Sequence, residues 1–187
     1  VYHTLRHQLQ IKRPALSIHL AFADTCPPTG PQVVGTLANR GVEEIVMVPL
    51  DLSRVCEPSR QMQEVVEASR RHRPEVRIAM ARPIGPAIEL LNVLDVRLRN
   101  ALSAAHATEL DGLVMSSPAW GDTRGAGLIA RRARQWAAHH RLPVLVAQGD
   151  GTGPDVTSAM QSLRQLGRRN IAVGSVYIAP TESYRRQ

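Results

Sequence analysis

An uninterrupted apolar run constrains the fold of this chain more than any other stretch. Residues 45–50 read Ile-Val-Met-Val-Pro-Leu, without the alternation of apolar and polar residues that a half-exposed strand shows. Such a run is typical of a parallel strand that helices cover on both faces. We therefore expect a buried central strand here, followed by a polar loop at residues 51–57. Ligands gather at the carboxyl ends of strands in open α/β sheets, so this loop is the first candidate site.

Strand-like and helix-like segments alternate along the rest of the chain. Short apolar runs predict further strands at residues 16–23, 76–81, 112–115, 143–147 and 170–178. Apolar residues spaced three and four apart predict helices at residues 1–12, 33–40, 62–69, 87–102, 123–137 and 156–166. This alternation predicts an α/β protein with parallel sheets and helices on both faces.

An internal repeat suggests how the chain is organised. Thr29-Gly30-Pro31, a helix, a stop at Gly41 and a strand from Ile45 recur as Thr152-Gly153-Pro154, a helix, a stop at Gly167 and a strand from Ile171. The repeat predicts two flavodoxin-like halves from a duplication, at residues 1–105 and 106–187.

The two predicted halves begin differently. The second half begins with a strand and the first with a helix, so by analogy we expect a further strand upstream of Val1. Direct pairing of the strands expected at Ile18 and Ile45 would contradict that expectation.

The charge balance bears on possible partners. The formal net charge is +7, and Lys12 is the only lysine. A basic surface favours nucleic acid or a polyanionic small molecule, although arginine-rich solvent faces explain it more simply. With 3% aromatic residues and no recognisable nucleic-acid motif, we expect no nucleic-acid partner.

Cysteine content and hydropathy bear on where the protein works. The chain has two cysteines, no secretory signal and no apolar run near the roughly 18 residues of a membrane span. We expect a cytoplasmic monomer or homodimer without membrane contact.

Several motifs together resemble one family. They are Val46-Met47-Val48-Pro49-Leu50 before a polar loop, Ala81-Arg82-Pro83-Ile84-Gly85-Pro86 before a leucine-rich helix, Asp122-Thr123-Arg124 after a short strand, and the closing Val176-Tyr177-Ile178-Ala179-Pro180. In this order they resemble the class II, ATP-independent sirohydrochlorin cobalt or iron chelatases of cobalamin and siroheme synthesis. The resemblance implies a lyase that inserts Co²⁺ or Fe²⁺ into sirohydrochlorin or a related tetrapyrrole. The metal is then a substrate, and no organic cofactor is implied.

The sequence departs from that family at the metal-binding position. Such enzymes usually carry one histidine in a His-Gly-Ser motif after the first strand, a position that would lie before Val1. A second histidine usually follows the central strand, where this sequence has Glu57 beside Cys56. Glu57 would then be the catalytic base and a metal ligand, with the Cys56 thiolate as a second ligand and Cys26 in the same cleft. The alternatives are a helix-start acid at Glu57 and inert cysteines.

The resemblance also implies how the substrate is held. Sirohydrochlorin carries eight carboxylates, which arginines would bind through charge-assisted hydrogen bonds. The expected substrate-binding residues are Ser53, Arg54, Arg82, Ser116, Ser117, Trp120 and Arg124. Surface ion pairs would explain the arginines equally well. The rival hypothesis is a non-catalytic tetrapyrrole-binding or metal-binding protein. A nucleotide-binding protein is disfavoured, because no Gly-x-Gly-x-x-Gly follows a predicted strand.

Overall fold

The computed structural model describes residues 1–23, 26–118, 121–149 and 153–178. The chain forms two compact units. Unit 1 comprises Val1–Leu50 and Pro58–Pro83, and unit 2 comprises Asp51–Glu57 and Ile84–Gln187. Packing thus assigns residues 84–105 to unit 2, and the division of a duplicated chain near residue 105 stays a prediction.

Unit 1 is built on two parallel strands. Its elements are α1 (Tyr2–Lys12), α2 (Gly30–Ala38), β1 (Glu44–Met47), α3 (Arg60–His72) and β2 (Arg77–Met80). Strand β1 pairs with β2 so that Ile45 lies opposite Ile78. Val34 of α2 and Val66 of α3 pack against this pair to form the core of the unit.

The prediction of a central strand buried on both faces is wrong for β1. Ile45 and Met47 point into the core, whereas Val46 is 61% exposed and Val48 is 52% exposed. The reason is that α2 and α3 contribute to one cluster on a single face of the two strands. The apolar run thus predicted a strand correctly. It did not reveal that helices of unit 1 cover only one face of that strand.

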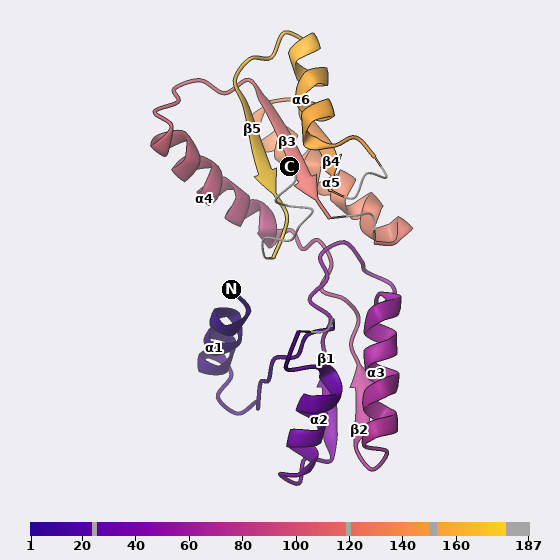
Figure 1. Ribbon diagram of the computed structural model, residues 1–187. Helices are drawn as coiled ribbons and strands as arrows, with labels where there is room; N and C mark the ends of the chain where they lie inside the picture. The colour runs from indigo at the N-terminus through magenta and orange to yellow at the C-terminus, as the bar shows by residue number, and fades with distance from the viewer. Residues whose placement is uncertain (24–25, 119–120, 150–152, 179–187) are drawn as a thin grey trace. The chain divides into compact units, whose positions relative to one another are not determined.

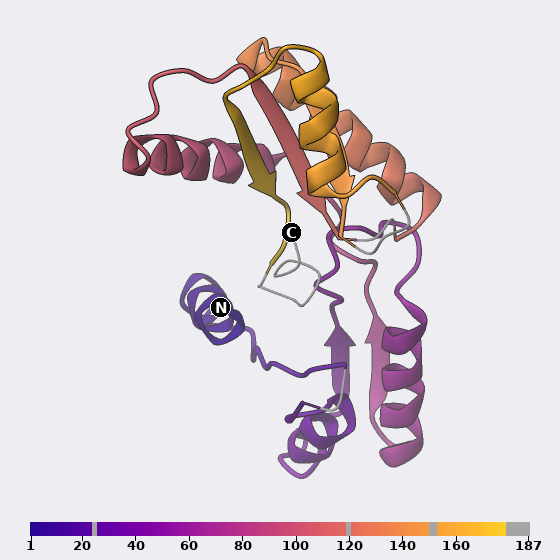
Figure 2. The same cartoon turned by 45° about the horizontal axis from the view of Figure 1, so that its top comes forward.

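The prediction of a strand at residues 16–23, all of which the structure describes, is also wrong. The segment makes no ladder, and its one isolated bridge joins Phe22 to Thr29. Helix α1 lies against it instead, since the Gln10 side chain accepts from the Ile18 N–H at 3.1 Å and donates to the Leu16 carbonyl at 2.6 Å. The Gln10 side chain thus forms hydrogen bonds with backbone groups that would otherwise be available to a neighbouring strand. Figures 1 and 2 show α1 apart from α2 and α3.

Unit 2 contains a three-stranded parallel sheet. Its strands are β3 (Gly112–Ser117), β4 (Val144–Gln148) and β5 (Ile171–Ser175), in the order β4-β3-β5. The first strand of the unit therefore lies between the second and the third, as in flavodoxin-like sheets. Every residue of β3 is buried.

Helices cover both faces of this sheet, as predicted (Figure 1). On one face Leu113 and Met115 pack with Trp136 of α5 (Thr123–His140) and with the apolar stripe of α4 (Glu89–Ala104). On the other face Val114 packs against Leu163 of α6 (Val156–Gln165). The residues of β3 alternate between two cores, which explains why Leu113, Val114 and Met115 follow one another without a polar residue between them.

The repeated motifs share one local geometry. Gly41 after α2 and Gly167 after α6 both have a φ of +80°, the left-handed region that glycine adopts without steric cost. The residue after each glycine donates to a leucine carbonyl five residues back, at 3.1 Å for Val42 to Leu37 and 3.0 Å for Arg168 to Leu163. The two copies therefore end their helices in the same way. Among the described residues, no helix has the length and apolarity that crossing a membrane would require.

Candidate active site

The polar loop Asp51–Glu57 is part of unit 2 although it follows β1 in the chain. Leu52 is 9% exposed and packs in the same core as Leu94 and Met115. The Asp51 carbonyl accepts a hydrogen bond from the Gly85 N–H at 2.9 Å. The loop is therefore fixed to the sheet and helices of unit 2 by an apolar anchor and a backbone bond.

Asp51 organises the first turn of this loop. Its Oδ1 atom accepts from the Ser53 N–H at 2.7 Å and from the Ser53 hydroxyl at 2.8 Å. Its Oδ2 atom lies 3.8 Å from Nε of Arg54. An aspartate that binds the backbone two residues ahead is typical of a tight polar turn. Ser53 is buried and its hydroxyl proton is directed to Asp51, so the structure gives this serine a role within the loop.

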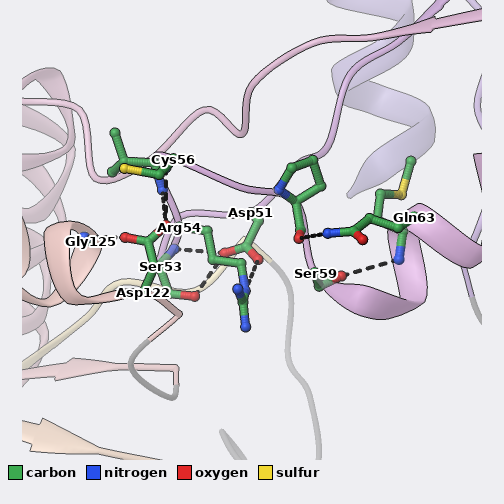
Figure 3. A network of polar contacts seen from close by, with 11 residues as sticks. Asp51, Ser53, Arg54, Cys56, Ser59, Gln63, Asp122 and Gly125 are labelled. Carbon is green, nitrogen blue, oxygen red and sulfur yellow. Dashed lines mark hydrogen bonds and ion pairs between the residues drawn. The ribbon is translucent and has the colours of Figure 1, made fainter.

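Asp122 ties the other end of the loop to helix α5 (Figure 3). Its Oδ2 atom accepts from the backbone N–H groups of Val55 at 2.9 Å and Cys56 at 3.0 Å. Its Oδ1 atom accepts from the Gly125 N–H at 2.6 Å, which makes Asp122 the N-cap of α5. These bonds, that from Val55 above all, lower the pKa of Asp122 from 3.8 to about 2, against the opposing effect of burial. The contact between Asp122 and the backbone of residues 55 and 56 was not expected from the sequence.

Two glycines allow the close approach of loop and helix. A Cβ atom at Gly121 or at Gly125 would overlap the carbonyl group of Ser53. Because only glycine has no Cβ, the backbone of the loop can rest directly on the first turn of α5. The backbone of Cys56 and Glu57 is thereby held at a helix N-terminus, where partial positive charge favours anions.

The structure therefore brings part of the expected site together. Cys56, Glu57 and Arg124 are exposed, and all three belong to the loop or to the first turn of α5. Cys56 carries a free thiol. Arg82 is exposed and belongs to unit 1, as does Cys26. Trp120 lies outside the described residues.

Ser116 and Ser117 lie at the carboxyl end of β3 but are fully buried. Among the described residues, the hydroxyl of Ser117 has no hydrogen-bond partner. Its carbonyl accepts from the Tyr177 hydroxyl at 2.9 Å and from the Gly149 N–H at 3.1 Å. A tetrapyrrole would contact these two serines only after the residues that cover them move.

A cluster that the sequence reasoning missed lies elsewhere in unit 2. Among the described residues, the one group of three His, Cys or carboxylate side chains with ligand atoms close together is Asp95, His139 and His140. Cys56 and Glu57 form no such group there. The adjacent histidines at the end of a predicted helix were a sequence signal, but Asp95 joins them only in the folded chain.

Comparison with solved structures places the fold among the chelatases. The chain is similar to SirB from Bacillus subtilis with Fe³⁺, with a TM-score of 0.63 and 14% identity over 97% of this chain and 73% of that one. It is also similar to the sirohydrochlorin chelatase SirB from Bacillus subtilis subspecies spizizenii in complex with cobalt. That match has a TM-score of 0.59 and 15% identity over 95% of this chain and 81% of that one. No match is found among curated proteins.

The α/β architecture, with a polar loop beyond the strands, is thus that of the SirB chelatase structures. The CbiX family model matches residues 1–101, just over half of the chain. This chain belongs to the CbiX family. The resemblance inferred from the sequence motifs is confirmed.

Proposed function

We propose that this protein is an ATP-independent lyase that inserts Co²⁺ or Fe²⁺ into sirohydrochlorin or a related tetrapyrrole. The match to the CbiX family is the observation that carries the proposal. The fold it shares with SirB, whose solved structures hold Fe³⁺ or cobalt, supports it. The divalent metal is a substrate in this reaction, and no organic cofactor is needed.

Metal insertion requires a ligand that presents the ion and a base that accepts protons from two pyrrole nitrogens. We assign both tasks to Glu57, whose exposed carboxylate can accept a proton and coordinate through oxygen. The exposed Cys56 thiol beside it is the proposed second ligand, as thiolate. Both side chains project from a backbone that Asp122 holds in place.

Asp122 is a positioning residue in this proposal. With a pKa of about 2 it is ionised at neutral pH, and three hydrogen bonds from backbone N–H groups use its oxygens. A carboxylate whose pKa lies so far below neutral pH is a weak proton acceptor. Asp122 therefore does not replace Glu57 as the base.

Substrate binding is proposed to rely on charge. Arg54 and Arg124 lie in the loop and at the start of α5, where guanidinium groups can pair with carboxylates of the macrocycle. Arg82 is the proposed contribution of unit 1. The other residues proposed to contact the tetrapyrrole are Ser53, Ser116, Ser117 and Trp120.

The second candidate function is that of a non-catalytic tetrapyrrole-binding or metal-binding protein. Within the described residues of unit 2, Cys56 and Glu57 are not part of a group of three side chains with ligand atoms close together, which favours this alternative. The two functions differ in turnover, because a carrier binds the tetrapyrrole without accelerating metal insertion.

The decisive experiment mixes purified protein, sirohydrochlorin and Co²⁺ and follows the absorbance change of metal insertion. We expect insertion faster than the control without protein, and a loss of at least tenfold in Glu57→Gln. Glu64→Gln is the matched control, since Glu64 is exposed on α3 and pairs only with Arg60 there. Tetrapyrrole binding without acceleration would establish the carrier function instead.

The assembly and location of the protein are proposals of the same kind. We infer a cytoplasmic monomer or homodimer that binds the tetrapyrrole rather than nucleic acid or a membrane. Light scattering after size-exclusion chromatography, with and without sirohydrochlorin, measures the oligomeric state directly.

A further inference from the structure

A second group of potential metal ligands lies on helices α4 and α5 of unit 2. Asp95 comes from α4, and His139 and His140 come from the last turn of α5. One ligand atom from each of the three side chains lies within 4.8 Å of the others. None of these residues takes part in the proposed chelatase reaction.

The carboxylate of Asp95 is the centre of the group. Its Oδ1 atom accepts from Nε1 of Trp136 at 2.7 Å and lies 2.8 Å from Nε2 of His140. Its Oδ2 atom lies 3.6 Å from Nε2 of His139. Both carboxylate oxygens therefore face imidazole nitrogens, and one of them is oriented by a tryptophan.

Packing in the core holds this arrangement. Trp136 is fully buried, and its ring meets the His140 ring edge to face with centroids 5.8 Å apart. The rings of His139 and His140 meet in the same way at 4.8 Å. The side chain of Asp95 is 14% exposed, whereas that of His139 is 68% exposed. Two members are thus fixed by the core, and the third closes the group from the solvent side.

A pocket gives access to the group. It has a volume of about 410 Å³, and its lining includes Asp95, His139 and Trp136. Glu89 and Asn92 of α4 also line it. A metal ion bound by the three side chains would have room in this pocket for water or a small anionic ligand.

A tryptophan side chain also orients the Asp95 carboxylate. The Trp136 N–H donates a hydrogen bond to Oδ1 of Asp95 and so fixes the orientation of that carboxylate. Metal-binding side chains are commonly oriented by such a hydrogen bond from a residue that does not itself bind the metal.

We propose that Asp95, His139 and His140 form a binding site for a divalent transition-metal ion. Two imidazoles and one carboxylate suit Zn²⁺, Co²⁺, Ni²⁺ and Fe²⁺, and they leave coordination positions open toward the pocket. His139 lies 14 residues beyond Gly125 on the same helix, about 21 Å along its axis. The site is therefore separate from the loop at residues 51–57 and does not depend on the proposed function.

Calorimetric titration of the full, chelator-treated protein with Zn²⁺ tests the proposal. We expect a binding event whose affinity falls at least tenfold in His139→Ala and in Asp95→Asn. Neither change should unfold the protein, because His139 is largely exposed and asparagine keeps an oxygen for the Trp136 N–H. The matched control is His3→Ala, an exposed histidine on α1 that should leave this binding unchanged.

Thermal unfolding provides a second readout. A ligand that binds only the folded state raises the melting temperature, so Zn²⁺ should stabilise the wild-type protein more than His139→Ala. Equal affinities in wild type, His139→Ala and Asp95→Asn would overturn the proposal, as would an equal loss in His3→Ala. The tetrapyrrole assay separates the two sites, since His139→Ala should keep full insertion activity and Glu57→Gln should keep this Zn²⁺ site.

Discussion

The Oδ2 atom of Asp122 lies 2.9 Å from the backbone nitrogen of Val55, a residue 67 positions earlier in the chain. The same side chain caps α5 through the Gly125 N–H. One carboxylate thus ends a helix and fixes the loop that carries the proposed catalytic groups. Removing it should disturb both.

Asp122→Ala should lower the free energy of unfolding by about 2 kcal/mol, because it removes a helix cap and two further bonds to backbone N–H groups. Urea denaturation followed by circular dichroism measures the change. Asp155→Ala is the matched control, since Asp155 caps α6 through Ser158 alone. We expect a smaller loss there, and equal losses would mean that the bonds to Val55 and Cys56 contribute nothing.

The pH dependence of stability should reveal the same carboxylate. The pKa of Asp122 is about 2 in the folded protein against an ordinary 3.8, so the unfolded chain binds the proton more tightly. Its stabilisation is fully present above about pH 4 and is lost as the pH falls toward 2. The stability difference between wild type and Asp122→Asn should therefore be largest near neutral pH and shrink below pH 4. A difference that stays constant down to about pH 2 would contradict the assignment.

Gly125→Ala should displace the loop, because the new Cβ would overlap the Ser53 carbonyl. We expect a lower melting temperature and slower metal insertion. Gly127→Ala is the matched control in the same helix, where the added methyl meets open space. That change should stabilise the protein by up to about 1 kcal/mol, since alanine favours helix over glycine. Similar melting temperatures for the two variants would show that the close approach is not required.

Arg124→Ala should weaken sirohydrochlorin binding by roughly two- to fivefold, the effect of one exposed ion pair with a carboxylate. Fluorescence titration measures the dissociation constant. Arg131→Ala, also exposed on α5, should bind as the wild type does. Higher salt should reduce the difference between the variants, because exposed charges are screened. Equal affinities at low salt would remove Arg124 from the binding surface.

The sequence was most informative where local pattern decides structure. Apolar periodicity predicted the six helices of the described residues, and apolar runs predicted their five strands. The order β4-β3-β5 also follows the expected flavodoxin-like arrangement. These features depend on residues close together in the chain, so a single sequence contains them.

The errors have a common physical cause. Whether residues 16–23 form a strand depends on a neighbouring strand, and Leu16 and Ile18 of this segment instead bond to Gln10. The exposure of Val46 depends on which face α2 and α3 cover. The group at Asp95 requires two helices to pack together, because His139 lies 44 positions after Asp95 in the chain. Such contacts arise from tertiary packing, which local pattern does not contain.

The placement of Leu52 in the core of unit 2 also bears on how the protein can be divided. A polypeptide ending at Pro83 would contain residues 51–57 without Leu94, Met115 and Asp122, the side chains that hold them. A polypeptide beginning at Ile84 would leave an apolar hole where Leu52 packs. Neither polypeptide therefore contains a complete folding unit. If the two were expressed separately and mixed, the loop would have to pack against residues 84–187 again before metal insertion could be recovered.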